Sequence, residues 1–254
     1  MSGRLLAFIA LSVAMVGAGD ALAGPNEDGV IILHAVPYQS RSGQSPCSYD
    51  ATLNSCSEAN YHITDGNQWN WFVLGVFPAG RSPRVMGATF GIDYDDTTVY
   101  LLDLSPCTDF ELPTADWPRP GQGTAVTWST PQTDMFVKMY AFAGYEYYGT
   151  DTSFCLTPHP SQGGYFADDS VPSILDPIVD YGCLGFNGDP GYLPCPPGAE
   201  GACCIPGAGC VVLSEDECVA GGGDWIGPGV PCDPNPCAVP VVERSWGTVK
   251  RDFR

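Results

Sequence analysis

Basic residues are scarce in this chain. Its 254 residues include 10 Lys and Arg against 29 Asp and Glu, which gives a formal net charge of −19 at pH 7. Four of the ten basic side chains lie within residues 244–254, so the charged side chains in the rest of the chain are mostly acidic. An acidic surface repels phosphate backbones and anionic lipid headgroups. The composition therefore excludes nucleic acid and anionic membrane surfaces as main partners.

Histidine and catalytic motifs are equally rare. None of the three histidines lies near a Cys-x-x-Cys, which argues against a zinc site. The sequence lacks a Gly-x-Ser-x-Gly elbow and a His-Glu-x-x-His motif. His159 lies between two prolines and is expected to be a turn residue. We therefore predict that the protein is not an enzyme; a hydrolase with an unrecognised site is the third of three functional alternatives.

Long apolar runs are also missing after residue 23. The start of the chain has one positive charge, an apolar core over residues 5–16 and the small residues Ala21 and Ala23. This pattern is typical of a cleavable secretory signal peptide, and the core is short for a membrane span. A membrane anchor is the alternative. We expect a signal peptide over residues 1–23, a mature chain from Gly24, and no transmembrane segment after cleavage.

Cysteine, in contrast, is numerous for a chain of this length. An even number, twelve, in an exported chain predicts disulfide bonds. Six cysteines are widely spread and six are crowded together, with a Pro-rich segment between the sets. We expect three bridges within each set. In the first set, the short, turn-rich loop predicts Cys47 with Cys56; the other four cysteines could pair in three ways, of which we favour Cys155 with Cys183 and Cys107 with Cys195. Spacing does not choose among the fifteen pairings of the second set. The two sets are Cys47, Cys56, Cys107, Cys155, Cys183 and Cys195, then Cys203, Cys204, Cys210, Cys218, Cys232 and Cys237.

The hydrophobic pattern before residue 199 predicts an all-β domain. Short runs rich in branched and aromatic residues alternate with breaks rich in Pro, Gly, Asp and Ser, and this spacing is typical of an immunoglobulin-like or jelly-roll β-sandwich. The run QWNWFVLGVF is apolar on both faces and predicts a central strand. Strands are expected over residues 29–36, 68–77, 84–94, 97–104, 123–129, 134–145 and 153–157.

The second set of cysteines defines a small module over residues 199–238. A segment of this length cannot bury enough apolar surface to fold unaided, so bridges must stabilise it. Ser214 and Glu217 have the spacing of a capping box, which predicts a short helix that ends near residues 221–223. Cys203 and Cys204 are adjacent, and we expect them to bond to two different partners.

Two resemblances follow from these motifs. The segment VMGATFGIDYDDTTVYLLDL resembles cohesin-like and related immunoglobulin-like sandwiches, which implies a sandwich fold. The pattern GACC…GxC…LSExEC…GGxW…C…PC, together with FGIDYD, DFELP, GTAVTW and FADDSVPSILDP, is similar to uncharacterised secreted bacterial proteins that pair a β-rich domain with such a module. This likeness implies an extracellular or envelope location and an extracellular or envelope partner, and it carries no activity.

The pattern of the last segment, residues 239–254, predicts a linker and a short amphipathic tail. Its end, VERSWGTVKRDFR, is similar to short tails of such secreted proteins, which implies a sorting or anchoring tag. The alternative is an ordinary frayed terminus. The tag residues are Trp246, Lys250, Arg251, Phe253 and Arg254.

Two groups of side chains are candidates for ligand binding. Calcium prefers several oxygen ligands, and Asp93, Asp95, Asp96 and Asp168 are the carboxylates that could supply them. The alternative is that these Asp side chains bond their own backbone in turns. No other cofactor is expected. Tyr145, Tyr147 and Tyr148 lie at a predicted strand end, where exposed rings could hold a sugar.

The function predicted from these observations is therefore coarse. We expect a secreted or cell-surface structural or interaction protein, with a carbohydrate- or calcium-binding adhesion module as the alternative. A strip of exposed aromatic rings would favour sugar binding, and convergent carboxylates would favour calcium.

Overall fold

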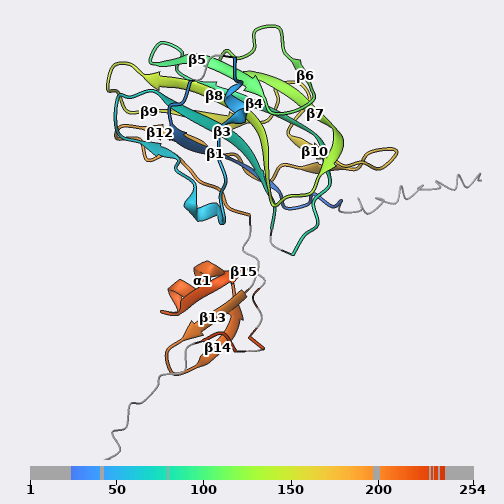
Figure 1. Cartoon of the computed structure of the whole chain (residues 1–254), viewed down its shortest axis with the longest axis vertical. Coiled ribbons are helices and arrows are strands. Elements are labelled where there is room, and N and C mark those ends of the chain that lie inside the picture. The colour runs from blue at the N-terminus through green and yellow to red at the C-terminus, as the bar shows by residue number, and fades with distance from the viewer. Residues whose placement is uncertain are drawn as a thin grey trace, which may run out of the picture.

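The computed structural model describes residues 24–40, 43–78, 80–196, 201–228, 230, 232, 233 and 235–237 (Figure 1). The expected signal peptide (residues 1–23) and the expected tail with Trp246, Lys250, Arg251, Phe253 and Arg254 lie outside these residues. Nearly all of the regular structure is strand, so the all-β prediction is confirmed. No helix among the described residues is long and apolar enough to cross a membrane.

The first sheet has four antiparallel strands. Their order is β1-β3-β8-β5, and residue Trp71 of β3 lies opposite Ala35 on one side and Phe142 on the other. The central position of β3 agrees with its two apolar faces, which the sequence pattern predicts. The strands are β1 (Val30–Pro37), β3 (Trp69–Val76), β8 (Phe136–Glu146) and β5 (Val99–Pro106).

The second sheet has eight strands and is centred on a long strand. This strand pairs with β7 along one edge, and with β10 and then β9 along the other. β6 extends the sheet beyond β7, whereas β11, β12 and β2 extend it on the opposite side. The strands are β4 (Val85–Tyr94), β7 (Gln122–Gln132), β6 (Phe110–Pro113), β10 (Tyr165–Ala167), β11 (Leu175–Pro177), β9 (Thr152–Thr157), β12 (Cys183–Phe186) and β2 (His62–Ile63).

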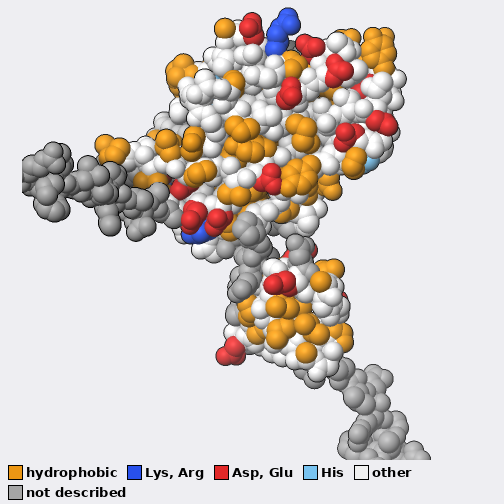
Figure 2. Space-filling model, turned by 180° about the vertical axis from the view of Figure 1, so that it is seen from behind, with side chains coloured by type: hydrophobic (Ala, Val, Ile, Leu, Met, Phe, Trp, Pro, Cys, Tyr) orange, Lys and Arg blue, Asp and Glu red, His pale blue; other side chains and the backbone are white. Residues whose placement is uncertain are grey.

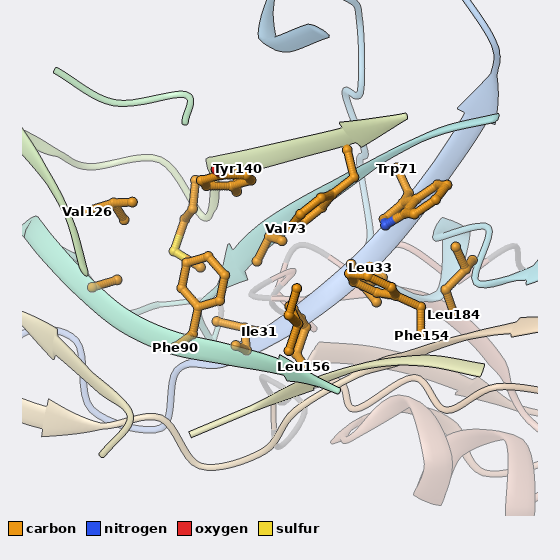
Figure 3. Packing of buried hydrophobic residues seen from close by; sticks show 14 of the residues in the cluster. Ile31, Leu33, Trp71, Val73, Phe90, Val126, Tyr140, Phe154, Leu156 and Leu184 are labelled. Atoms are coloured by element: carbon orange, nitrogen blue, oxygen red, sulfur yellow. The ribbon is translucent and has the colours of Figure 1, made fainter. Parts of the chain in front are cut away.

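The main hydrophobic core lies between the two sheets. Figure 3 shows side chains of β1, β3 and β8 pointing toward side chains of β4, β7, β9 and β12. Trp71 is fully buried there and packs against Phe142, Phe154 and Phe186. Burying one large apolar side chain stabilises a fold by about 1.5–3 kcal/mol. The core of two facing sheets therefore holds the sandwich together, as the pattern predicts.

A second, smaller core lies on the outer face of the first sheet. Phe72 and Leu74 of β3 are buried there beneath the segment of residues 45–60, which contains the 3-10 turns η1 (Pro46–Ser48) and η2 (Cys56–Glu58). Two disulfides hold this covering segment, Cys47–Cys107 and Cys56–Cys195.

The expected bridges Cys47–Cys56 and Cys107–Cys195 are therefore wrong. Short spacing favours a bridge between neighbours in the sequence, but the covering segment holds its two cysteines at separate places on the sandwich. Each then meets a cysteine from a distant part of the chain. The expected bridge Cys155–Cys183 is present, and it joins residues that lie directly opposite on β9 and β12.

The cysteine-rich module forms a three-stranded sheet with one helix. β13 (Gly201–Ile205) lies between β14 (Gly209–Leu213) and β15 (Asp224–Pro228), and α1 (Glu215–Ala220) follows β14. Ser214 and Glu217 form the expected capping box. Three bridges stabilise the module, Cys203–Cys218, Cys204–Cys237 and Cys210–Cys232. The adjacent cysteines thus have different partners, and each of the six bridges stays within one of the two sets.

Candidate binding surface

Tyrosine rings gather where β5 begins and β8 ends. Tyr100 of β5 lies opposite Tyr145 of β8, and their ring centroids are 5.9 Å apart with the planes at 22°. The Tyr147 ring lies 5.7 Å from that of Tyr100 and 4.8 Å from that of Tyr148. The structure thus brings together the three tyrosines that the sequence singled out and adds a fourth. We call Tyr100, Tyr145, Tyr147 and Tyr148 the tyrosine cluster.

Most of the tyrosine cluster faces solvent. Tyr147 is 60% and Tyr148 63% exposed, whereas Tyr145 is half-buried. A hydrogen bond with Tyr148 raises the pKa of the Tyr100 hydroxyl. Leu102, on the same edge strand, is 47% exposed. This is an uncharged, largely aromatic surface on an acidic protein.

Glu146 of β8 holds the turn that carries Tyr147 and Tyr148. Its side chain is buried, and its carboxylate accepts hydrogen bonds from the N–H groups of Tyr148 (2.8 Å) and Gly149 (2.6 Å) and from the hydroxyl of Thr150 (2.8 Å). Burial pushes the pKa of Glu146 upward, but these hydrogen bonds outweigh it and the pKa is lowered. An ionised carboxylate thus fixes the turn that carries Tyr147 and Tyr148.

The turn is also tied to the neighbouring sheet. The side chain of Asn187, which follows β12, donates to Glu146 Oε2 (3.1 Å) and to the carbonyl of Thr150 (2.7 Å). Asp151 accepts the N–H of Gly188 at 2.8 Å. Because both sheets hold the turn, the rings are presented on a rigid support.

Sequence reasoning missed Tyr100. In the strand VYLLDL, alternate side chains point to opposite faces, so Tyr100 and Leu102 can share the outer face. That alternation was the available signal. The pairing of Tyr100 with Tyr145 depends on the order of strands β5 and β8, which the sequence pattern does not contain.

The four candidate calcium ligands do not converge. Among the described residues, no group of three or more His, Cys, Asp or Glu side chains could hold a metal ion. Asp95 accepts the N–H and hydroxyl of Thr97, and these bonds lower its pKa. Asp96 lies 3.9 Å from Arg119, and Asp93 is exposed on β4. Calcium binding stays a prediction of the sequence without a formed site.

Asp168 has a separate structural role. It is buried at the end of β10, where Oδ1 accepts hydrogen bonds from Ser170 and from the N–H of Ile174. Burial pushes the pKa of Asp168 upward, and these bonds more than offset that effect, so the pKa is lowered. This carboxylate shapes the loop to β11, which is the turn role that the sequence analysis gave as the alternative to calcium binding.

His159 also acts within a turn. Its Nδ1 accepts the backbone N–H groups of Ser161 (3.3 Å) and Gln162 (3.2 Å), and burial lowers its pKa.

An open hollow of about 470 Å³ lies beside the Cys47–Cys107 disulfide, and Lys138 is one of its lining residues. The Lys138 ammonium donates to the carbonyls of Cys47 and Tyr49. These groups are committed to structural bonds. The absence of enzymatic activity stays a prediction.

No protein-family model and no curated protein sequence matches the chain. Solved structures that resemble it include cohesin modules. One from a family 33 glycoside hydrolase of Clostridium perfringens has 10% identity and a TM-score of 0.37, covering 50% of this chain and 91% of its own.

Two further cohesins give the same picture. CaCohA2 of Clostridium acetobutylicum has 14% identity and a TM-score of 0.37, covering 52% of this chain and 89% of its own. The sixth cohesin of scaffoldin B from Acetivibrio cellulolyticus, solved with a Cel5 dockerin, has 10% identity and a TM-score of 0.37, covering 62% of this chain and 98% of its own. These matches agree with the expected cohesin-like resemblance. The fold described above rests on the sheets themselves, and similarity at this level assigns no partner to this chain.

Proposed function

We propose that this chain is a secreted, non-catalytic interaction protein that contacts a protein partner through the tyrosine cluster. The observation that carries the proposal is the exposure of Tyr147 and Tyr148 beside Tyr100 on a turn fixed by a buried carboxylate. Tyrosine is enriched at protein interfaces, where one ring supplies both apolar area and a hydroxyl.

The rigid support favours binding for an energetic reason. Ordering a mobile side chain or loop at an interface opposes binding, so a turn that is already fixed loses less entropy.

The charge around the tyrosine cluster matters as well. Acidic side chains are spread over the face of the β-sandwich seen in Figure 2, where basic ones are few, whereas the tyrosine cluster is made of an uncharged residue type. A partner would therefore contact the rings at side chains that carry no formal charge of their own.

The proposed location is outside the cytoplasm. Twelve cysteines form six disulfides and none is free. Disulfides persist in oxidising compartments, which supports the expectation of a signal peptide. The acidic composition also favours solubility of a secreted protein.

Site-specific cross-linking tests the protein-partner proposal. A photo-reactive residue at position 147 should capture one partner, whereas the same residue at the 98% exposed position 171 should not. With that partner purified, the Tyr147→Ala/Tyr148→Ala variant should bind at least about tenfold more weakly, since losing an interface hot spot costs about 2 kcal/mol or more. Equal affinity of the variant and the parent would refute the proposal.

Carbohydrate binding is the second candidate, and one observation favours it. The Tyr147 and Tyr148 rings lie at 82° to each other, and each residue is more than half exposed. Aromatic faces and hydroxyls suit an uncharged sugar. Pull-down with insoluble neutral polysaccharides distinguishes the two candidates: retention that is lost in Tyr147→Ala/Tyr148→Ala supports a glycan, and retention unchanged by the substitutions places any glycan site elsewhere.

A further inference from the structure

The beginning of the expected mature chain is built into the β-sandwich. Gly24 is buried, and its backbone nitrogen lies 2.7 Å from Oδ1 of Asp176 on β11. The N–H of Asn26 donates to the other oxygen, Oδ2, at 2.9 Å. Pro25 has no N–H, so residues 24 and 26 supply both donors. One carboxylate is thus held by two backbone nitrogens that lie about 150 positions earlier in the chain.

Asp176 is a buried carboxylate whose recorded partners carry no charge. It is 3% exposed, and the four ion pairs recorded among the described residues involve other carboxylates. An ionised carboxylate that is removed from water without a cation is costly. A cation at the position of the Gly24 nitrogen would offset this cost.

The surroundings leave room for glycine and little else. A Cβ on residue 24 would overlap the Asp176 carboxylate. Asn26 is fully buried and fixes the next residues, because its Oδ1 accepts the N–H of Arg84 at 2.9 Å and its Nδ2 donates to the carbonyl of Arg84 at 3.4 Å. The nitrogen of residue 24 is therefore held against the Asp176 carboxylate, because Asn26 is fixed to Arg84, the residue before β4.

We propose that the chain is processed at the Ala23–Gly24 bond and that the α-ammonium group released on Gly24 forms a buried ion pair with Asp176. Hydrolysis adds one water: Ala23 leaves with a carboxylate and Gly24 gains the ammonium. The small residues Ala21 and Ala23 place the cut at this bond, and the buried carboxylate supplies an independent reason. Processing thereby converts a hydrogen bond between an amide N–H and the carboxylate into an ion pair, in which donor and acceptor are both charged.

The ion pair predicts a pH dependence of known sign. An α-amino group has an ordinary pKa of about 7.7–8.0, and the carboxylate raises it in the folded protein. The added stability is therefore complete below about pH 7.7 and is lost as pH rises through the raised value. If the carboxylate raises this pKa by about one unit, the equilibrium constant for unfolding increases about tenfold as the pH rises from about 7.7 to above the raised pKa.

Two chains of native sequence test this dependence. One starts at Gly24, and the other starts several residues earlier, so that residue 24 keeps a neutral N–H. Urea unfolding from pH 7 to pH 10 should show the additional loss of stability only in the first chain. Their tyrosines and lysines are the same, so the difference isolates the α-amino group. Identical pH profiles would overturn the proposal.

Two further measurements complete the test. The Asp176→Asn variant of the Gly24-first chain should lose the additional pH dependence, and a full dependence in that variant would count against the ion pair. Mass spectrometry of the protein secreted from the full-length sequence should give a chain that begins at Gly24, and a start at another residue would refute the processing site. The comparison of the two native-sequence chains stands even if Asp176→Asn does not fold.

Discussion

Glu146 is the residue on which the geometry of the tyrosine cluster most directly depends. A glutamine at this position keeps one acceptor oxygen but turns an amide toward donors that the carboxylate now satisfies. We expect Glu146→Gln to lower the free energy of unfolding by about 1–3 kcal/mol, the cost of leaving a buried donor without a partner. Urea denaturation at pH 7 measures this change.

The pH dependence of the same variant provides a control. Because the pKa of Glu146 is lowered in the fold, its contribution is present above the ordinary glutamate value of about 4.3 and is lost as pH falls through the lower, folded value. Glu146→Gln should therefore lose less stability on acidification than the parent. Glu111→Gln keeps an oxygen that can still accept the Thr124 hydroxyl and should change little. Equal effects of the two substitutions would contradict this role for Glu146.

His34 predicts a pH effect in a different range. Its ring is buried beside the covering segment, and Nδ1 accepts the N–H of Asn60 at 3.0 Å. Burial lowers its pKa, and nearby Asp50 only partly opposes this shift. The neutral ring thus stabilises the fold above about pH 6.5, and this contribution is lost as pH falls through the folded pKa.

Replacement of His34 tests the assignment. His34→Asn should reduce the difference between the urea midpoints measured at about pH 7.5 and pH 5, a range set by the ordinary histidine pKa. If the His34 variant keeps the full difference, another group is responsible for the acid sensitivity.

At the scale of elements, the disulfides differ in how much chain they enclose. Cys56–Cys195 spans 139 residues and Cys155–Cys183 spans 28. Loop-closure entropy gives about 5 kcal/mol for the longer loop and about 3.6 kcal/mol for the shorter one. Replacing the first pair by alanines should therefore lower the stability in urea more than replacing the second pair. The reverse order would show that local strand pairing, rather than chain entropy, sets the effect.

Strand positions were largely predictable, whereas strand and cysteine partners were not. The run around Trp71 has a strong apolar pattern, and the structure forms β3 there. β11 has only three residues, too few to show a period, and it went unpredicted. Cys47 and Cys56 are close in the sequence, but the folded position of the covering segment decides their partners. For the same reason, Tyr145, Tyr147 and Tyr148, which are close in the sequence, could be grouped from it, whereas the place of Tyr100 beside them depends on the pairing of β5 with β8.

At the scale of the whole molecule, the net charge of −19 opposes compaction. The ion pairs recorded among the described residues involve only Arg81, Arg84 and Arg119, so most carboxylates have no basic partner there. Added salt screens their repulsion, since the Debye length falls from about 30 Å at 0.01 M to about 8 Å at 0.15 M. We expect the melting temperature to rise over this range.

Repeating the measurement at a second pH separates the screening of charge repulsion from general effects of salt. Near the isoelectric point, about pH 4.1, the net charge vanishes and the same addition of salt should change the melting temperature far less. Scanning calorimetry at the two pH values and two salt concentrations measures both responses. An equal rise at both pH values would show that charge repulsion is not the cause.

The crossed bridges of the covering segment have a consequence for maturation. A chain exported N-terminus first delivers Cys47 and Cys56 together, before either native partner, Cys107 or Cys195, has emerged. Short loops close readily, so an oxidant acting during translocation favours the non-native pair. That early bridge must then be broken by thiol–disulfide exchange. For an exported chain, we therefore expect the yield of native protein to depend on a disulfide isomerase in the receiving compartment as well as on oxidising power.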